Sequence, residues 1–479
     1  MVSTKSSVID RLMLSLPHSW SRPGQKMLAI FAGVLCAALC AAQSSSVTGS
    51  VPSGTATNTV VPLSLRDAVT MAVRYNLGSV ESAQNERAAR GERLIALSSL
   101  LPQIDAGVSE RVNQVSTATL GIPKNPIIPP VLGPFGYSGT DVSLNQTLFS
   151  LPAIRRYQAA RDAEQAAQLS YQDVLDVVTL TVGSAYLQVI EANSRVEAQE
   201  AQVRNAKALF DQATSEYESG TRPRIDVART EVQLHTEEYT LSVDRNSFAT
   251  AKIALARAIG LPLGQEFTLT DQLPYADLQP PTVEEALEQA DESRSDLRAS
   301  RDLEKAADRA LSAAKSQRLP SVSTQTDLSD VGKTFGHSHG NFEFQAGVRM
   351  PIFTGERIKG EIEQARAAAE QRKAEAENLR GQVDYDVRTA FLNLNAATEQ
   401  VNVARRNLDL ANENLTRSKD RFSSGVTDSV EVVQAEQSLA SANDQYITST
   451  YNHNLSKLEL ARALGIARNS YSEYLGGNQ

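Results

Sequence analysis

The fold is decided by residues 182–220, which read VGSAYLQVIEANSRVEAQEAQVRNAKALFDQATSEYESG. Apolar and small residues recur in this stretch at alternating steps of three and four, and the series ends just before Gly220. The series comprises Val182, Ala185, Val189, Ala192, Val196, Gln199, Val203, Ala206, Phe210, Ala213 and Tyr217. A 3,4 spacing sustained over this length is the seam of a coiled coil. We therefore predict a long helix that packs against a neighbouring helix.

The same seam occurs a second time, 205 residues further along the chain. It begins at Val387, ends at Phe422 and is again followed by a glycine, Gly425. Both halves also end alike, with LARAIG at 255–260 and LARALG at 460–465. Such self-similarity indicates that one architectural unit was built and then repeated.

Each half has the same predicted order of elements. The first repeat, 64–260, contains a helix, a β-hairpin at about 102–149, a long helix at 153–219 and a helix at 226–259. The second repeat, 282–466, contains a helix, a β-hairpin at about 320–352, a long helix at 356–424 and a helix at 431–464. Pro102 and Pro320 end the first helix of each repeat. We expect a connector at 261–281 and a tail at 467–479.

The two hairpins are recognised by a change of period from about 3.6 to 2. At 342–350 the apolar residues Phe342, Phe344 and Val348 alternate with polar ones. Strands of about 10 residues cross an outer membrane at a tilt, although a soluble hairpin pair with one wet face has the same pattern. Four strands cannot close a barrel, and an open edge in lipid leaves backbone groups unsatisfied. A membrane role therefore requires several copies, whose number the spacing does not set.

The N-terminal residues 1–42 are expected to be a secretory signal peptide. An apolar run at 27–42 follows Lys5, Arg11, Arg22 and Lys26, and it is short for a membrane-spanning anchor, which is the alternative. Both cysteines lie in this run, each after a leucine, so we expect no disulfide and no lipid anchor in the mature chain. Residues 43–63 are rich in Ser, Thr and Gly and predict a flexible linker.

Composition narrows the function classes. The net charge is −9 and no stretch concentrates Lys and Arg, which argues against nucleic acid as a partner. His337 and His339 fall in a hairpin loop without a third ligand, so we expect no metal site. No nucleophile constellation, phosphate loop or paired-acid site stands out. We expect neither a cofactor nor enzymatic activity.

The ordered set of features resembles the outer-membrane efflux protein family, the TolC-like export ducts. The resemblance covers nearly all of 64–466 and rests on the duplication and on matched motifs. These are the PIFTGERI junction at 351–358, AYL at 185–187 with AFL at 390–392, the YESG and FSSG turns at 217–220 and 422–425, and the two terminal LARA runs. It implies a mainly α fold with a transmembrane β-barrel portion, the TolC-like α/β-barrel, formed by a homotrimer. The barrel would lie in outer-membrane lipid and the helical tunnel in the periplasm.

The resemblance also implies partners. The tunnel would dock to a periplasmic membrane-fusion adaptor of an inner-membrane pump of RND or ABC type. Efflux of small molecules and type I protein secretion share this component, and the sequence does not separate them. The alternative outside the channel class is a periplasmic coiled-coil protein with a purely structural role.

The sites implied by the resemblance cluster at the two glycine turns. The adaptor-docking residues are Ser219, Gly220, Thr221, Ser424, Gly425 and Val426. Asp226 and Glu431, each six residues after its glycine, are implied to face the tunnel near its entrance, where charged rings attract cations. The same acids suit a helix N-terminus. Arg222, Arg224 and Phe422 complete the gate candidates, while Thr427 stands where the family has an arginine.

Overall fold

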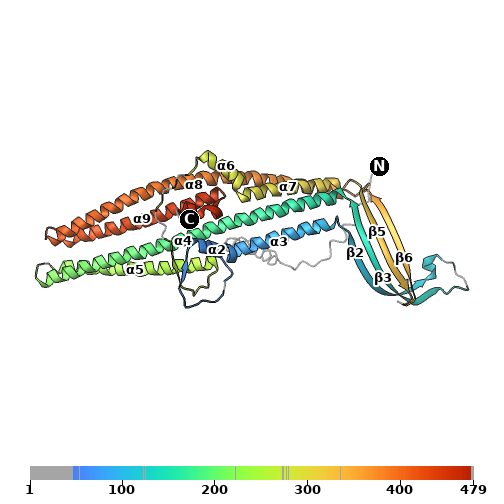
Figure 1. The fold of residues 1–479 in the computed structure, drawn as a ribbon, viewed down its shortest axis with the longest axis horizontal. Coiled ribbons are helices and arrows are strands. Elements are labelled where there is room, and N and C mark those ends of the chain that lie inside the picture. The colour runs from blue at the N-terminus through green and yellow to red at the C-terminus, as the bar shows by residue number, and fades with distance from the viewer. Residues whose placement is uncertain are drawn as a thin grey trace, which may run out of the picture.

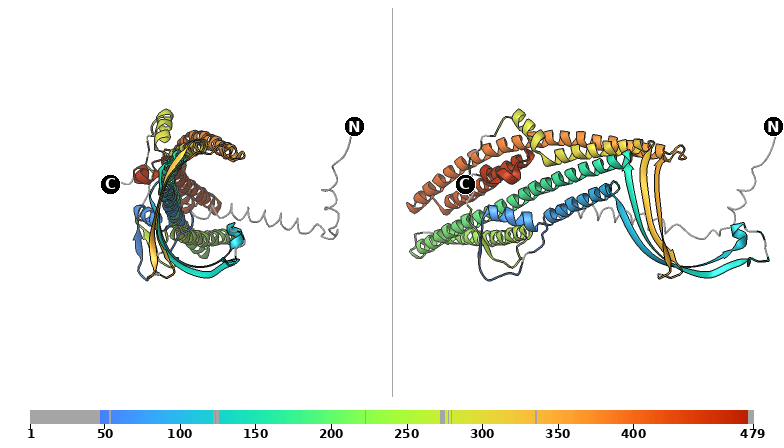
Figure 2. Two further views of the ribbon diagram at one scale, coloured as in Figure 1. Left: turned by 90° about the vertical axis from the view of Figure 1, so that its right-hand side faces the viewer. Right: turned by 45° about the vertical axis from the view of Figure 1, so that its right-hand side comes forward.

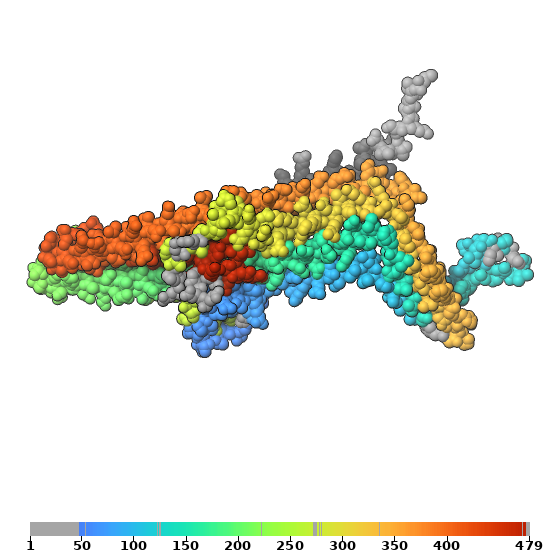
Figure 3. Space-filling model, turned by 45° about the horizontal axis from the view of Figure 1, so that its top comes forward, coloured from blue at the N-terminus to red at the C-terminus, as the bar shows by residue number. Residues whose placement is uncertain are grey.

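The computed structural model describes residues 47–475 except 53, 122, 124, 125, 222, 272–274, 277, 279 and 335. The segment expected to be a signal peptide, 1–42, lies outside the described residues. The molecule is elongated (Figure 3). Its long helices lie side by side, and a twisted sheet continues them at one end (Figure 1).

Two very long helices form the backbone of the molecule. They are α4 (Leu151–Glu218) and α8 (Arg357–Ser423), and at about 1.5 Å per residue each is about 100 Å long. Toward the glycine turns, α4 packs against α5 (Arg224–Ile259) and α8 against α9 (Ser429–Ala463). Most seam positions are buried, from Val182 to Ala213 and from Val387 to Phe422, whereas Tyr217 is exposed. Burial of the seam explains why such long helices are stable.

The helix that we expected at the start of each repeat is in fact two helices. In the first repeat these are α2 (Leu65–Tyr75) and α3 (Leu77–Ser98), and in the second α6 (Val283–Ser293) and α7 (Ser295–Ser316). A single extended residue, Asn76 or Arg294, separates them. The buried Asn76 side chain accepts from the Gly78 amide and donates to the Ala258 carbonyl. Neither break contains Pro or Gly, so tertiary contacts produce it.

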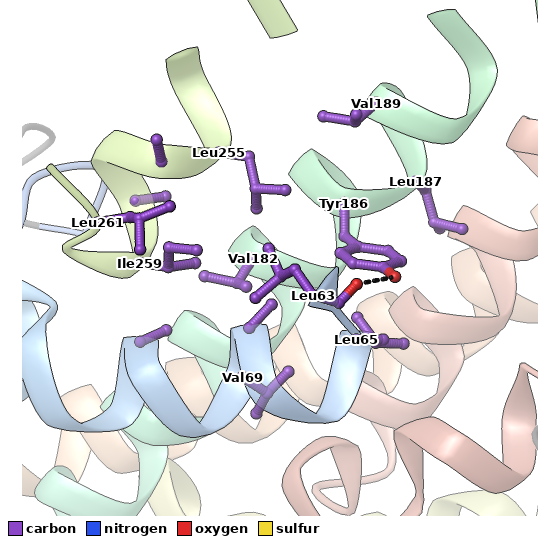
Figure 4. Packing of buried hydrophobic residues seen from close by; sticks show 14 of the residues in the cluster. Leu63, Leu65, Val69, Val182, Tyr186, Leu187, Val189, Leu255, Ile259 and Leu261 are labelled. Atoms are coloured by element: carbon purple, nitrogen blue, oxygen red, sulfur yellow. Dashed lines mark hydrogen bonds between the residues drawn. The ribbon is translucent and has the colours of Figure 1, made fainter. Parts of the chain in front are cut away.

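The largest core lies halfway along the molecule, around Tyr186 (Figure 4). The Tyr186 hydroxyl lies 3.0 Å from both the Leu63 carbonyl oxygen and Asp271 Oδ2 and can donate to either. Asp271 also accepts from the Leu65 amide at 2.7 Å, at the first residue of α2. Burial, and then the Asp271 charge, raise the pKa of Tyr186 well above its usual value. One stretch of α4 is apolar and long enough to cross a membrane, but half of it is buried, as expected of a core helix.

The predicted flexible linker and the predicted tail both contain regular elements. Val61–Leu63, inside the predicted linker 43–63, is strand β1 and pairs in parallel with β4 (Phe267–Leu269) of the connector. Within the predicted tail, Ala467–Tyr474 is a helix, α10, which packs against α4 and α9. Both corrections have one cause, since apolar side chains such as Leu63 and Leu475 enter the central core.

The sheet has four antiparallel strands in the order β2-β3-β5-β6. They are β2 (Gln103–Ser116), β3 (Val131–Phe149), β5 (Ser321–Gly332) and β6 (Ser338–Arg349), all longer than the 10 residues we expected, and a short 3₁₀ helix, η1 (Thr117–Leu120), follows β2. The sheet is open, so the chain alone is not a barrel. In register, Leu328 lies opposite Val142 and Phe342, all on one face. This face is apolar and exposed at Ile104, Val108, Val112, Leu328, Phe342, Phe344 and Val348.

Each strand continues into a helix in the same lateral order. Near the sheet, α4 packs between α3 and α7, and α7 packs against α8, so the helix order is α3-α4-α7-α8. These helices adjoin β2, β3, β5 and β6 respectively. Sheet and helices thus form one curved wall (Figure 2), with β2 and α3 at one edge and β6 and α8 at the other.

Substitution of Tyr186 tests how much the hydrogen bond of its hydroxyl contributes to stability. Tyr186→Phe removes the hydroxyl that can donate to the buried Leu63 carbonyl or to Asp271, so we expect a loss of about 1–2 kcal/mol of stability. Thermal unfolding of the purified protein in detergent, followed by circular dichroism, measures it. Tyr385→Phe, at an exposed position on α8, is the control and should leave the midpoint unchanged. Equal midpoints for the two variants would contradict this role of Tyr186.

Candidate functional site

The candidate site is the pair of turns at the end of the molecule farthest from the sheet (Figure 1). At the first turn the Gly220 amide donates to the Tyr217 carbonyl and the Thr221 amide to the Glu216 carbonyl, both at 2.9 Å. The second turn has the same two bonds, from the amides of Gly425 and Val426. This is the Schellman arrangement, which needs a left-handed residue. Gly220 (φ 77°) and Gly425 (φ 70°) supply it without steric cost.

Side chains at both turns are accessible from outside the chain. The six residues expected to dock an adaptor are all exposed: Ser219, Gly220, Thr221, Ser424, Gly425 and Val426. Val426, a large apolar side chain, is 69% exposed. The tips therefore present a small apolar contact surrounded by hydroxyl groups.

Asp226 joins the two helical hairpins. It lies in the first turn of α5 and is only 4% exposed. Its Oδ1 accepts a 2.6 Å hydrogen bond from the hydroxyl of Ser429, the first residue of α9, which is fully buried. The guanidinium of Arg229 lies 3.7 Å from the same oxygen. Asp226 thus fastens α5 to α9. The sequence analysis did not single out Ser429, because a serine at the start of a helix is normally explained as a helix N-cap.

Glu431, the repeat counterpart of Asp226, stays within its own hairpin. Its Oε2 accepts from the Thr427 hydroxyl at 2.6 Å, and its Oε1 lies 3.5 Å from Arg421 Nε. The Glu431 side chain is 37% exposed. The two acids that the repeat pairs are therefore not equivalent in the single chain.

The other gate candidates are Arg222, Arg224 and Phe422. Among the described residues no ion pair joins Arg224 to Asp226 or Glu431, and the arginines that lie near these acids are Arg229 and Arg421. Arg222 lies outside the described residues. Phe422 is 1% exposed and packs in the core of the α8–α9 tip, as its seam position requires, so within one chain it does not line an opening.

A further carboxylate lies deeper in the contact between α5 and α9. Glu436 is 2% exposed, and in the part of the chain that the structure describes neither of its oxygens has a hydrogen bond. Lys419 Nζ lies 3.6 Å away. Burial raises the pKa of Glu436, Lys419 opposes this, and the Glu237 charge adds to the rise. The sequence does carry a signal for the burial of Glu436, since this glutamate shares a helix face with the apolar residues Val432, Ala435 and Leu439 of α9.

The tip residues include no metal-binding set. Among residues 47–475, as far as they are described, no group of three or more His, Cys, Asp or Glu side chains could hold a metal ion. His337 and His339 are exposed at the β5–β6 turn.

Comparison with known proteins gives a consistent answer. The model of the family described as outer membrane efflux protein matches residues 80–261 and 286–466. "Outer membrane protein TolC" of Vibrio cholerae is 22% identical over 375 residues, which cover 77% of this chain and 83% of that protein. "Toluene efflux pump outer membrane protein TtgF" of Pseudomonas putida is 22% identical over 421 residues, 84% of this chain and 83% of that protein.

Solved structures share the fold. The outer membrane protein VceC of Vibrio cholerae superposes with a TM-score of 0.71 at 18% identity, covering 84% of this chain and 96% of that one. The open state of the MtrE outer membrane channel of Neisseria gonorrhoeae superposes with a TM-score of 0.70 at 18% identity, covering 85% of this chain and 90% of that one. At these identities the likeness establishes the fold.

The buried Glu436 predicts how stability depends on pH. A carboxyl whose pKa is raised by folding binds its proton more tightly in the folded state, so its contribution to stability falls as pH rises above the ordinary value near 4.5. Glu436→Gln should therefore raise the thermal midpoint at pH 7 and change it little at pH 4. The control is Glu231→Gln, the exposed repeat counterpart, with no effect at either pH. An unchanged midpoint at pH 7 for Glu436→Gln would refute the prediction.

The Asp226–Ser429 bond predicts a local change. Ser429→Ala leaves a buried carboxylate short of a donor, which costs about 1–3 kcal/mol. Hydrogen exchange should accelerate in the first turns of α5 and α9, by about tenfold or more. Ser438→Ala, an exposed site on α9 whose hydroxyl bonds the Gln434 carbonyl of the same helix, serves as control. Equal exchange in both variants would show that the bond does not hold the tips together.

Proposed function

Because the chain belongs to the outer membrane efflux protein family, we propose that it is the outer-membrane channel of an export system, assembled as a homotrimer. It gives a passive exit duct to a tripartite efflux or type I secretion assembly. The protein is a transport component of the outer membrane, with its helical part in the periplasm, and not an enzyme.

The observation that carries the proposal is the open sheet with one exposed apolar face. In lipid, strands β2 and β6 would each leave a row of backbone groups without partners. If β6 of one copy pairs with β2 of the next, three copies supply twelve strands and close the ring. The exposed row that includes Phe342, Phe344 and Val348 then faces lipid.

The helices support the same assembly. Near the sheet, α8 buries only a narrow stripe, Ile358, Ile362, Ala369, Ala376 and Val383, and leaves the rest of its surface exposed. It lies at the same edge of the wall as β6, while α3 lies at the edge of β2. A neighbour paired at the sheet edge would therefore also cover the free face of α8. The tunnel would continue the barrel.

The tips are the proposed docking surface and gate. The exposed turn residues around Gly220 and Gly425 would contact a periplasmic membrane-fusion adaptor, itself bound to an inner-membrane pump of RND or ABC type. Asp226 and Glu431 from three chains would surround the entrance, with Arg222, Arg224 and Phe422 nearby. The buried bond from Ser429 to Asp226 is the element we propose to hold the entrance shut. On this proposal, Ser429→Ala also yields a channel that is open for more of the time.

Extraction from membranes and conductance test the proposed function together. We expect the protein in outer-membrane fractions, extracted only by detergent, as a trimer that runs as monomers after heating. Purified trimers should give discrete conductance steps in planar bilayers. A water-soluble monomer without conductance would instead support a periplasmic coiled-coil protein with a structural role.

A further inference from the structure

A groove lies between α5 and α9, over α4, beside β4 and the residues after it. It encloses about 760 Å³, within the range of about 300–1,000 Å³ in which proteins bind small molecules. The groove lies in the middle of the molecule, away from both the sheet and the tips. Its position places it outside the sites described above.

Aromatic side chains from four segments converge on the groove. They are Phe248, Phe267, Tyr275, Tyr446 and Tyr451. Two of the rings already face a cation, since Lys252 Nζ lies 4.9 Å from the ring centroid of Phe267 and 5.7 Å from that of Phe248. An ammonium at this distance is attracted by the negative face of an aromatic ring. The faces of these two rings are thus already turned toward a positive charge, that of Lys252, at the wall of the groove.

The charged side chains that line the groove also favour a positively charged ligand. Three carboxylates, on Glu191, Glu197 and Asp271, face one ammonium, on Lys252. Lys252 is paired with Glu266 outside the groove, at 3.1 Å, and Arg195 is 3.1 Å from Glu191.

Glu197 is the carboxylate left available at the groove. Its Oε1 accepts a hydrogen bond of 2.7 Å from the side-chain Nδ2 of Asn193, and Glu197 has no ion pair among the described residues. The neighbouring Tyr451 has its pKa raised by burial and then by the charges of Glu191 and Glu459, as expected where the potential is negative.

We propose that this groove binds an organic cation with an aromatic or bulky apolar body. The apolar body would contact the rings, and the positive charge would lie toward Glu197. An anion would be repelled by the carboxylates, and an inorganic cation would gain little from apolar walls. The site lies in the wall of the molecule and does not depend on the protein being a duct.

Binding of rhodamine 6G, an aromatic monocation, to the purified protein in detergent tests the proposal by fluorescence polarisation. We expect saturable binding at one site per chain, weakened as salt screens Glu197. Glu197→Gln should weaken binding about threefold to tenfold. The matched control is Glu200→Gln, which lies one turn further along α4, does not line the groove and should change affinity less than about twofold.

A second pair of variants tests the aromatic wall. Phe248→Leu keeps an apolar side chain but removes the ring, and should weaken binding about tenfold. Tyr239→Leu, at an exposed position on α5, is its control. Any of three results would overturn the proposal. They are binding of the dye that does not saturate, equal effects of Glu197→Gln and Glu200→Gln on affinity, and an affinity for the neutral dye Nile red equal to that for rhodamine 6G. Because Glu197 is exposed, its variant folds even if Phe248→Leu does not.

Discussion

The backbone groups at the two edges of the sheet are the constraint on which the account depends. Four strands pair with one another inside the chain, and among the described residues β2 and β6 have no further partner. The apolar face indicates lipid, where an unpaired edge costs several kcal/mol for each polar group. Because every strand continues into a helix, whatever satisfies the sheet edges also brings together the helices at the same edges. In the proposed assembly, the contact between copies that closes the sheet would therefore also close the tunnel.

Duplication builds the wall, but the two copies have diverged where the molecule needs a difference. Both turns use the same glycine geometry. Yet Asp226 fastens α5 to α9, whereas Glu431 bonds within its own hairpin. The buried Glu436 corresponds to an exposed residue, Glu231, in the first repeat. The contact between the two hairpins is thus asymmetric, with its buried acids drawn from both α5 and α9.

Much of this fold could be read from the sequence because the signals are periodic. The seams from Val182 and Val387 locate the long helices, and alternation at 342–350 locates β6. The breaks at Asn76 and Arg294 could not be foreseen, since long-range contacts cause them: Asn76 bonds Ala258, and Arg294 pairs with Asp386. At the tips the sequence identified Asp226, but its partner Ser429 lies 203 positions away, and spacing alone does not pair them.

Engineered disulfides between copies test the central claim most directly. With Cys36 and Cys40 replaced by serine, Ser109→Cys in β2 is combined in turn with single cysteines at positions 339 to 348 of β6. Pairing of β2 with β6 of a neighbour predicts oxidative cross-links to dimers and trimers at only a few of these positions. They are the ones close to the residue opposite 109 whose side chains lie on the same side of the sheet as residue 109. Absence of cross-links at every position would contradict the shared sheet and the channel built from it.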